Sequence, residues 1–243
     1  MNVYISFLIG FVSLNAQTAS LPKNAPISVL SSIKTVDIEH TNELATFDPA
    51  WVDSLSLSLP CYGIPVPKRT MRLPNAPRNY RNGTHRGLDF FANWGTPVRS
   101  VADGIVVRSD LHYEEVPADF RENLLKATTR VGHTPSDIFN SVLLGKSVFL
   151  DHGFDLIPGF RTISIYAHLS HIEKEIVPGA KVKRGELLGK SGNTGMREST
   201  IGSKAGSHLH WELILQKEGE EIYLGKGMSN PELYNMLSRI FVK

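Results

Sequence analysis

Cysteine is nearly absent from this 243-residue sequence, and the single Cys61 excludes an intrachain disulfide framework. An excess of one charge is also missing, because 26 Lys and Arg against 24 Asp and Glu leave a net charge of +2. This balance does not predict nucleic-acid binding, and we expect no nucleic-acid partner. The content of 41% apolar and 21% charged residues excludes a disordered chain or a coiled coil.

No apolar run has the roughly 20 residues of a membrane span. The uncharged stretch 3–16 is shorter and is typical of the apolar core of a signal peptide, with cleavage expected after Ala16. We therefore predict a signal peptide at 1–16 and an exported protein, periplasmic or extracellular at the cell wall. Signal peptides usually carry Lys or Arg ahead of the apolar core, and none is present here, so an uncleaved membrane anchor is the alternative. If the signal peptide is cleaved, we expect no stable membrane insertion.

Prolines and glycines divide the rest of the chain. Eight prolines interrupt residues 17–80, which we interpret as a leader segment that packs on a following domain at 81–243. Short β-rich runs between glycines predict an all-β domain with an antiparallel, groove-forming sheet. The expected strands are 27–30, 54–59, 88–91, 98–101, 105–108, 147–150, 162–167 and 209–215.

Two helices are expected at the periphery of this sheet. The first, 118–130, has Phe120, Leu124 and Leu125 near helical spacing and lies in a segment, 109–145, that is typical of an insertion between two strands. The second, 231–241, follows Asn230 as N-cap within a C-terminal segment, 230–241. Its apolar face would be Leu233, Met236, Leu237 and Ile240, docked on the sheet.

Three motifs carry residues that can bind a metal or transfer a proton. In the run 207–215, strand alternation puts His208, His210 and Glu212 on one face. His85 and Asp89 stand four apart where a loop enters a strand, and His168 closes another strand. Histidine and aspartate are common zinc ligands. Each motif alone is equally typical of surface or packing histidines.

Together, the motifs resemble one family. The order H-x-x-x-D, Y-A-H-L and H-x-H, with G-T-P-V-R-S-V-A-D-G and V-P-G-A-K-V-K-R-G-E-L-L-G around them, is similar to the lysostaphin/LytM-type zinc metallopeptidases. The resemblance covers roughly residues 80–216. It implies the family's duplicated-hybrid-motif fold and its activity, cleavage of peptide bonds in peptidoglycan.

By position, the resemblance implies that His85, Asp89 and His210 hold one zinc ion per chain. His168 and His208 would be catalytic, flanking a zinc-activated water and the developing oxyanion. H-E-x-x-H does not occur, so an imidazole rather than a glutamate is the available base. Glu212 is either a hydrogen-bond partner of these histidines or a solvated strand residue.

Two segments depart from the family pattern. The loop 195–207 is longer than the usual glycine turn before H-x-H, and the insertion 109–145 is extra. Both could line the substrate groove. The remaining assigned histidines are expected to lie elsewhere: His112 and His133 on the surface, His152 and His171 in structural positions.

The resulting expectation is an exported zinc endopeptidase with peptidoglycan as its partner. A non-catalytic wall-binding regulator is the alternative, since some members of the family have lost zinc ligands. The glycine-bounded run 177–189 is also similar to biotinyl and lipoyl carrier hairpins, but the sequence lacks their M-K-M or D-K-A tripeptide. Because the leader runs directly into His85, we further expect a polar side chain of 75–82 to inhibit the site.

Overall fold

The computed structural model describes residues 46–242, so the predicted signal peptide and the strand expected at 27–30 lie outside the described residues. The strands are β1 Leu57–Ser58, β2 Pro77–Arg78, β3 Gly83–Thr84, β4 Leu88–Phe90, β5 Pro97–Arg99, β6 Gly104–Ser109, β7 Val148–Asp151, β8 Arg161–Ala167, β9 Leu169–Ile172, β10 Lys181–Val182, β11 Leu187–Ser191, β12 Leu209–Lys217, β13 Glu220–Tyr223 and β14 Phe241–Val242. The helices are α1 Ala118–Val131, α2 Ser136–Ile138, α3 Arg197–Thr200 and α4 Glu232–Ile240. Short turns of helix are η2 Pro49–Val52, η3 Thr70–Arg72, η4 Asn79–Arg81 and the π-helical turn η5 Phe139–Leu143.

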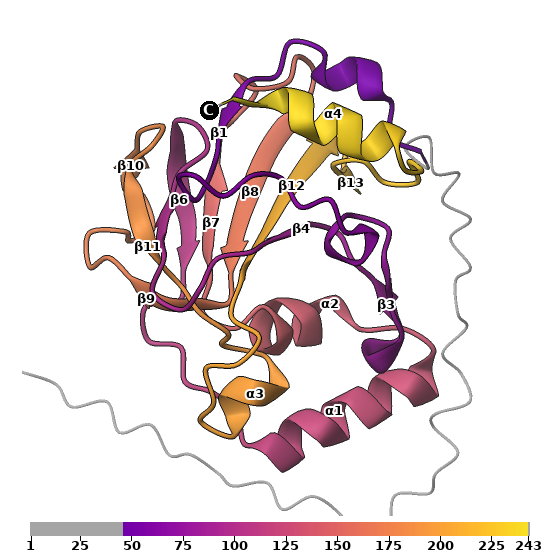
Figure 1. Ribbon diagram of the computed structural model, residues 1–243, viewed down its shortest axis with the longest axis vertical. Helices are drawn as coiled ribbons and strands as arrows, with labels where there is room; N and C mark the ends of the chain where they lie inside the picture. The colour runs from indigo at the N-terminus through magenta and orange to yellow at the C-terminus, as the bar shows by residue number, and fades with distance from the viewer. Residues whose placement is uncertain (1–45, 243) are drawn as a thin grey trace, which may run out of the picture. The chain divides into compact units, whose positions relative to one another are not determined.

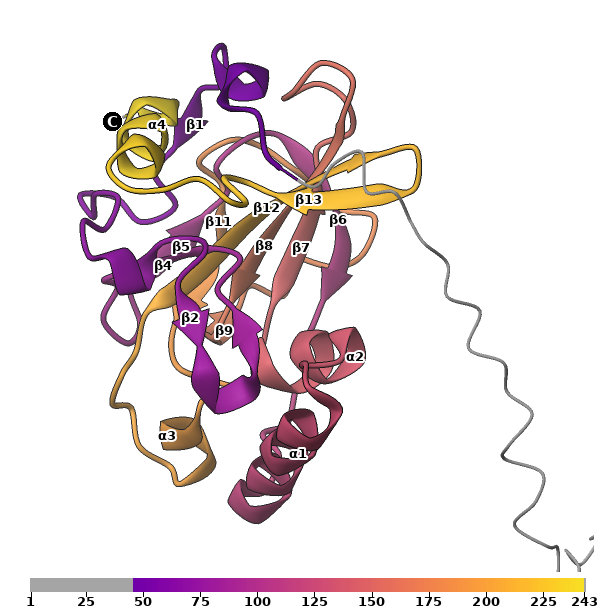
Figure 2. The same ribbon diagram turned by 90° about the vertical axis from the view of Figure 1, so that its right-hand side faces the viewer.

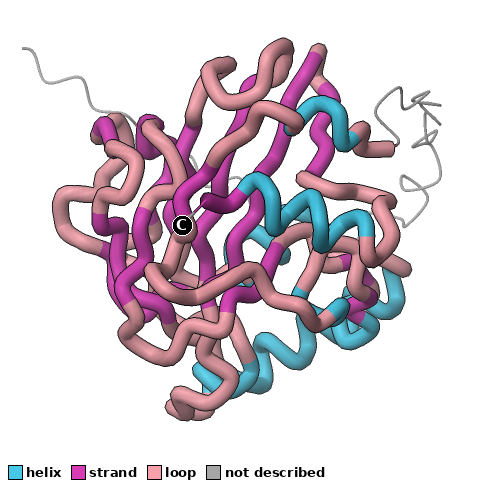
Figure 3. The backbone as a smooth tube through the Cα atoms, turned by 45° about the horizontal axis from the view of Figure 1, so that its top comes forward, coloured by secondary structure: helices cyan, strands magenta, loops and turns pink. Residues whose placement is uncertain are grey.

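The predicted all-β, antiparallel architecture is confirmed. Seven strands form the main sheet in the order β10-β6-β7-β8-β12-β13, with β4 paired to β12. A second sheet has the order β5-β11-β9, and every pair in both sheets is antiparallel. The helices lie at the periphery of the strands (Figure 3). The expected strand at 54–59 shortens to β1, which pairs in parallel with β14.

Strand β12 is covered on both faces. Leu209, Trp211 and Leu213 are fully buried in the main core, as their alternation predicts. The opposite face carries Ile214, which packs with Phe139 and other residues of the insertion. Helices α1, α2 and α3 gather at one end of the sheet, below β8 and β12 (Figures 1 and 2). The insertion therefore covers a sheet face that a simple groove would leave open.

The two predicted helices form, with two corrections. In α4 the face of Leu233, Met236, Leu237 and Ile240 is buried, as expected. The helix begins after Pro231 as N-cap, however, and has no side-chain capping bond, so Asn230 does not cap it.

The apolar residues near helical spacing in α1 do not share one buried face, because Leu125 packs against the core but Phe120 does not. Phe120 is 50% exposed, whereas Arg121, one position later, is only 7% exposed. Arg121 and Thr128 are the buried residues of this helix, seven positions and therefore two turns apart. The helix has turned a cationic side chain rather than an aromatic ring toward the interior.

The described part of the predicted leader contributes to the core of the domain. Buried residues between 46 and 80 are Phe47, Val52, Leu55, Leu57, Cys61, Val66, Leu73 and Ala76. Burial raises the pKa of the Cys61 thiol to about 12, which keeps it protonated and unreactive. None of the described helices has the length and apolar character needed to cross a membrane.

Candidate metal centre

His85 and Asp89 reach the site from a loop and from strand β4. Asp89 lies inside β4, and His85 precedes it by four residues. Between them, Gly87 touches β12 so closely that an added Cβ would collide with the carbonyl oxygen of Trp211. Glycine at this position therefore allows the chain to press His85 against the sheet.

The third residue, His210, is positioned by the pairing of strand β12 with its neighbours. β12 pairs with β4 so that His210 lies opposite Asp89, and on its other side with β8 so that His210 lies opposite Ala167. Directly opposed residues on neighbouring strands hold their side chains close together. Residues 121 positions apart in the chain are thus brought into contact by a single pairing.

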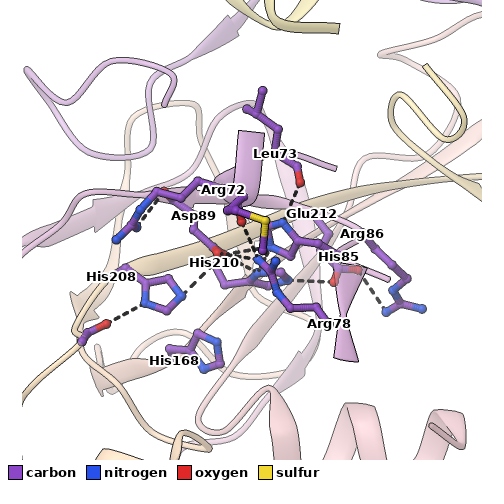
Figure 4. A network of polar contacts seen from close by, with 12 residues as sticks. Arg72, Leu73, Arg78, His85, Arg86, Asp89, His168, His208, His210 and Glu212 are labelled. Carbon is purple, nitrogen blue, oxygen red and sulfur yellow. Dashed lines mark hydrogen bonds and ion pairs between the residues drawn. The ribbon is translucent and has the colours of Figure 1, made fainter. Parts of the chain in front are cut away.

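Three donor atoms converge at this point. The Nε2 atom of His85 lies 2.9 Å from Asp89 Oδ1 and 3.1 Å from His210 Nδ1, and Asp89 Oδ1 lies 2.9 Å from His210 Nδ1. All three side chains are buried, with 2–8% exposure. Among the described residues, this is the group of His, Cys, Asp and Glu side chains arranged to hold a metal ion (Figure 4).

Outer hydrogen bonds fix which ring nitrogen faces the cluster. His85 Nδ1 lies 2.8 Å from the carbonyl oxygen of Leu73, which only accepts, so Nδ1 carries the proton. His210 Nε2 lies 2.8 Å from Glu212 Oε1, so Nε2–H donates there. When both rings are neutral, His85 Nε2 and His210 Nδ1 therefore present lone pairs toward Asp89, the donor set that zinc takes.

The electrostatics of the cluster keep Asp89 ionised. Burial alone would raise the pKa of Asp89, but the neighbouring His85 and His208 hold it well below its usual range. Burial would likewise lower the pKa of His210, yet hydrogen bonds to Asp89 and Glu212 raise it to about 9. Burial lowers the pKa of His85. The cluster therefore attracts one cation, a proton or a metal.

His168 and His208 stand beside the three donors. Their ring centroids are 4.9 Å apart, and His208 Nε2 lies 3.5 Å from Asp89 Oδ1. Each fixes its Nδ1–H on a carbonyl oxygen 2.8 Å away, that of Thr194 for His168 and that of Gly206 for His208. Each ring therefore leaves Nε2 for other partners. Figure 4 shows both rings on the side of the cluster opposite Arg86.

The backbone at His168 departs from the expected strand alternation. Strand β8 ends at Ala167, and His168 has a left-handed φ of 60°. Tyr166, which alternation would place on the same face, is fully buried and its hydroxyl accepts from the backbone N–H of Val101. His168 thus turns away from the face of Tyr166 and toward His208. Burial, then the nearby His208 and His210, lowers its pKa well below the usual range.

Glu212 is a partner of the histidines rather than a solvated strand residue. Its side chain is fully buried, and it pairs with Arg86 at 3.0 Å as well as with His210. The other assigned histidines lie outside the cluster. His112, His133 and His171 are exposed, and His152 is buried between the Asp103 carbonyl and Ser164.

The five site residues line a cavity of about 200 Å³. Residues from both departing segments complete its wall, namely Arg121, Phe139, Leu143 and Leu144 of the insertion and Gly195 and Met196 of the long loop. From the leader, Arg78 bonds Asp89 Oδ2 at 3.0 Å and Tyr80 lines the wall, as does Arg81, the first residue after the leader.

Sequence reasoning missed Arg86, Arg121 and the carbonyl groups of Leu73, Thr194 and Gly206. Arg86 lies inside the H-x-x-x-D motif, and a charged residue within a metal-binding motif can predict a hydrogen-bond partner for the groups around the ligands. Every residue has a backbone carbonyl whatever its side chain, so the sequence cannot indicate which carbonyls orient the histidines.

Comparison with known proteins shows which family this chain is similar to. Residues 129–223 match the model of "Peptidase family M23", a stretch that contains His168, His208 and His210. The chain is 30% identical over 140 residues to the peptidoglycan DD-endopeptidase ShyA of Vibrio cholerae, covering 58% of this chain and 22% of that protein. It is 27% identical over 142 residues to an uncharacterized metalloprotease of Buchnera aphidicola, covering 58% and 26%. The chain thus spans about a quarter of the length of these curated relatives.

Among solved structures, the catalytic domain of lysostaphin from Staphylococcus simulans is 21% identical, with 69% of this chain and 86% of that chain covered and a TM-score of 0.36. The resemblance seen in the sequence motifs is confirmed by the family model, because residues 129–223 match peptidase family M23.

Proposed function

We propose that this protein is a zinc-dependent endopeptidase that hydrolyses peptide bonds in peptidoglycan cross-links or stem peptides. The supporting observation is the convergence of three donor atoms from His85, Asp89 and His210 within 3.1 Å of one another. Lone pairs this close repel unless a cation lies between them, and two imidazoles with a carboxylate match the chemistry of zinc. The similarity to a peptidoglycan DD-endopeptidase supports the substrate, and with it an exported location.

In this proposal the two remaining histidines perform the proton transfers. Zinc, when bound, would activate water near neutral pH and polarise the scissile carbonyl. His208 and His168 keep Nδ1–H on backbone carbonyls, so their Nε2 atoms face the reacting groups. One Nε2 accepts the proton of the attacking water, and the other, once protonated, donates to the oxyanion.

Five substitutions test these roles. We expect His85→Ala, Asp89→Ala and His210→Ala to lose both zinc and hydrolysis of purified peptidoglycan, because two remaining donors hold zinc poorly. We expect His168→Ala and His208→Ala to retain about one zinc per chain and to lose roughly 100- to 10,000-fold in rate. Zinc per chain and rate are measured on the same samples.

Particular outcomes contradict the assignment. Loss of zinc in His208→Ala with retention in His210→Ala would exchange the roles of these two histidines. Full activity of His168→Ala would leave that residue a structural role only. A wild-type protein that neither binds zinc nor cleaves peptidoglycan would support the non-catalytic wall-binding regulator.

A further inference from the structure

The wall of the metal-centre cavity is cationic. Three guanidinium groups line it, those of Arg78, Arg81 and Arg121, against the single carboxylate of Asp89. Arg78 pairs with Asp89 at 3.0 Å, so these two charges compensate each other. Arg81 and Arg121 remain to be accounted for.

Arg121 is a buried cation without an ion pair among the described residues. It is 7% exposed, and its Nε–H donates to the carbonyl oxygen of Gly195 at 3.0 Å. The hydrogen bonds of the described part include no acceptor for its two terminal nitrogens. A guanidinium has five N–H donors, so most of its capacity is left for a ligand in the cavity.

Arg81, which lines the same cavity, also lacks an ion pair among the described residues. It is 6% exposed, donates from Nη2 to the carbonyl oxygen of Thr84, and stacks 4.7 Å from the ring centre of Phe139. Burial lowers its pKa, although Tyr80 and Glu212 act in the opposite direction.

The nearby acidic groups already have partners. Glu212 pairs with Arg86 and accepts from His210. Glu115 accepts from the Gly195 backbone N–H at 2.8 Å and from the Tyr113 hydroxyl at 2.9 Å. Two buried guanidinium groups facing one cavity without carboxylate partners are costly to the fold. Buried unpaired charges of this kind are typical of a binding site in which the ligand supplies the opposite charge.

We propose that Arg81 and Arg121 form a carboxylate-binding subsite, so that the cavity selects peptides with a free carboxylate close to the scissile bond. This inference rests on the proposed endopeptidase function and names its substrate class. Planar guanidinium groups bind carboxylates with paired hydrogen bonds. Stem-peptide cross-links carry such carboxylates, whereas an uncharged oligoglycine bridge offers none. Arg121 belongs to the insertion, so this preference comes from a segment that departs from the family pattern.

Binding without catalysis is the first test. One cross-linked muropeptide is prepared with its stem-peptide carboxylates free and again with them converted to carboxamides. Calorimetric titration in EDTA prevents both hydrolysis and metal coordination by the ligand. We expect the wild-type protein to bind the free acid at least roughly tenfold more tightly than the amide.

The variants assign that preference to the two residues. Arg81→Gln and Arg121→Gln should each lower affinity for the acid and leave affinity for the amide nearly unchanged. Arg121→Lys, which keeps the charge but not the planar fork, should recover part of the preference. Arg130→Gln, on the exposed side of the same helix α1, is the matched control and should retain it.

The same pair is then hydrolysed by the zinc-loaded protein, where kcat/KM should favour the acid. Equal binding of acid and amide, or equal losses for both ligands in the variants, would overturn the subsite. A preference seen only with zinc present would also overturn it, because the metal would then be binding the carboxylate. Preferential binding without hydrolysis would instead contradict the endopeptidase proposal and leave the subsite standing.

Discussion

At the residue scale, the ring orientation of His210 depends on Glu212. Glu212 Oε1 holds the Nε2–H of His210 at 2.8 Å, which leaves Nδ1 with a lone pair beside Asp89. Arg86, 3.0 Å from the other oxygen, keeps this buried carboxylate ionised. The pKa of Glu212 accordingly lies below its usual range, although burial alone would raise it.

Substituting Glu212→Gln tests this dependence. The new amide can present its NH₂ group to Nε2, which would shift the ring proton to Nδ1 and block the donor atom. We expect zinc affinity, measured by competition with a chelator, to fall roughly 10- to 100-fold. Glu221→Gln, at an exposed position on neighbouring β13, is the control. Unchanged affinity in Glu212→Gln would show that the ring needs no such partner.

Arg78 is a leader side chain that bonds the carboxylate of a candidate metal ligand, whereas Arg72 bonds the backbone carbonyl of Asp89. Arg78 Nη2 bonds both the Met71 carbonyl at 2.9 Å and Asp89 Oδ2 at 3.0 Å. Asn75, another polar residue of 75–82, instead donates to the carbonyls of Gly225 and Met228. We therefore propose Arg78 as the inhibitory contact, because its positive charge competes with a divalent cation for Asp89.

Arg78→Gln should tighten zinc binding several-fold, on the order of 1 kcal/mol, since a nearby like charge is removed. Hydrolysis at limiting zinc should rise in parallel. Arg69→Gln, an exposed position in the same segment, is the control. A point substitution is cleaner than truncation, because removing residues 46–69 would also remove buried Val52 and Leu57. Weaker zinc binding in Arg78→Gln would make this residue a support of Asp89, not an inhibitor.

At the element scale, the end of the insertion holds the loop that orients His168. Gly145 has a φ of 63°, and an added Cβ would collide with the backbone carbonyl of Thr194. That carbonyl oxygen accepts the Nδ1–H of His168 at 2.8 Å. The insertion therefore supports a proposed catalytic ring through one intermediate residue.

Gly145→Ala should displace Thr194 and lower kcat by at least roughly tenfold while zinc content stays near one per chain. Gly132→Ala is a matched control: Gly132 also has a positive φ, 83°, but open space around its Cβ position. Both substitutions place alanine at a positive φ. A loss of kcat in Gly145→Ala alone would therefore be caused by the collision with Thr194. Equal rates for the two variants would remove this link between insertion and site.

The elements themselves were largely predictable, since glycine-bounded β-rich runs coincide with β4, β6, β7, β8 and β12 to within one or two residues. The short strands β9, β10 and β11 were not predicted, because serine, histidine, lysine or glycine interrupts the apolar pattern of each strand. Helical spacing of apolar residues in α1 included Phe120, which is exposed in the structure. A helix that lines a polar cavity instead buries Arg121, and apolar periodicity cannot signal that.

At the scale of the whole molecule, the site joins residues that single motifs cannot connect. His85 and His210 are 125 positions apart, and only the pairing of β4 with β12 brings them within 3.1 Å. The sequence predicted this group through its resemblance to a family, and the roles within it stay predictions. The cationic wall was not predictable, because its members come from the insertion and from the junction between the leader and the following domain, whose packing no motif describes.

Protonation of buried His152 should couple pH to the stability of the whole fold. This ring is 4% exposed, with Nδ1 2.6 Å from the Asp103 carbonyl and Nε2 2.7 Å from Ser164 Oγ. Burial lowers its pKa below the ordinary 6.5. The unfolded chain therefore binds this proton more readily than the folded chain, and the free energy of unfolding must fall as pH drops below about 6.5.

One such group contributes at most about 1.4 kcal/mol per pH unit. Urea unfolding between pH 7.5 and 5, with EDTA present throughout, should show a smaller loss of stability in His152→Gln than in the wild type. His85 and His168, whose pKa values are also lowered, contribute equally to both proteins and cancel in the difference. His133→Gln, at an exposed position, is the control. If His152→Gln loses as much stability as the wild type over this range, the acid sensitivity of the fold resides in other groups.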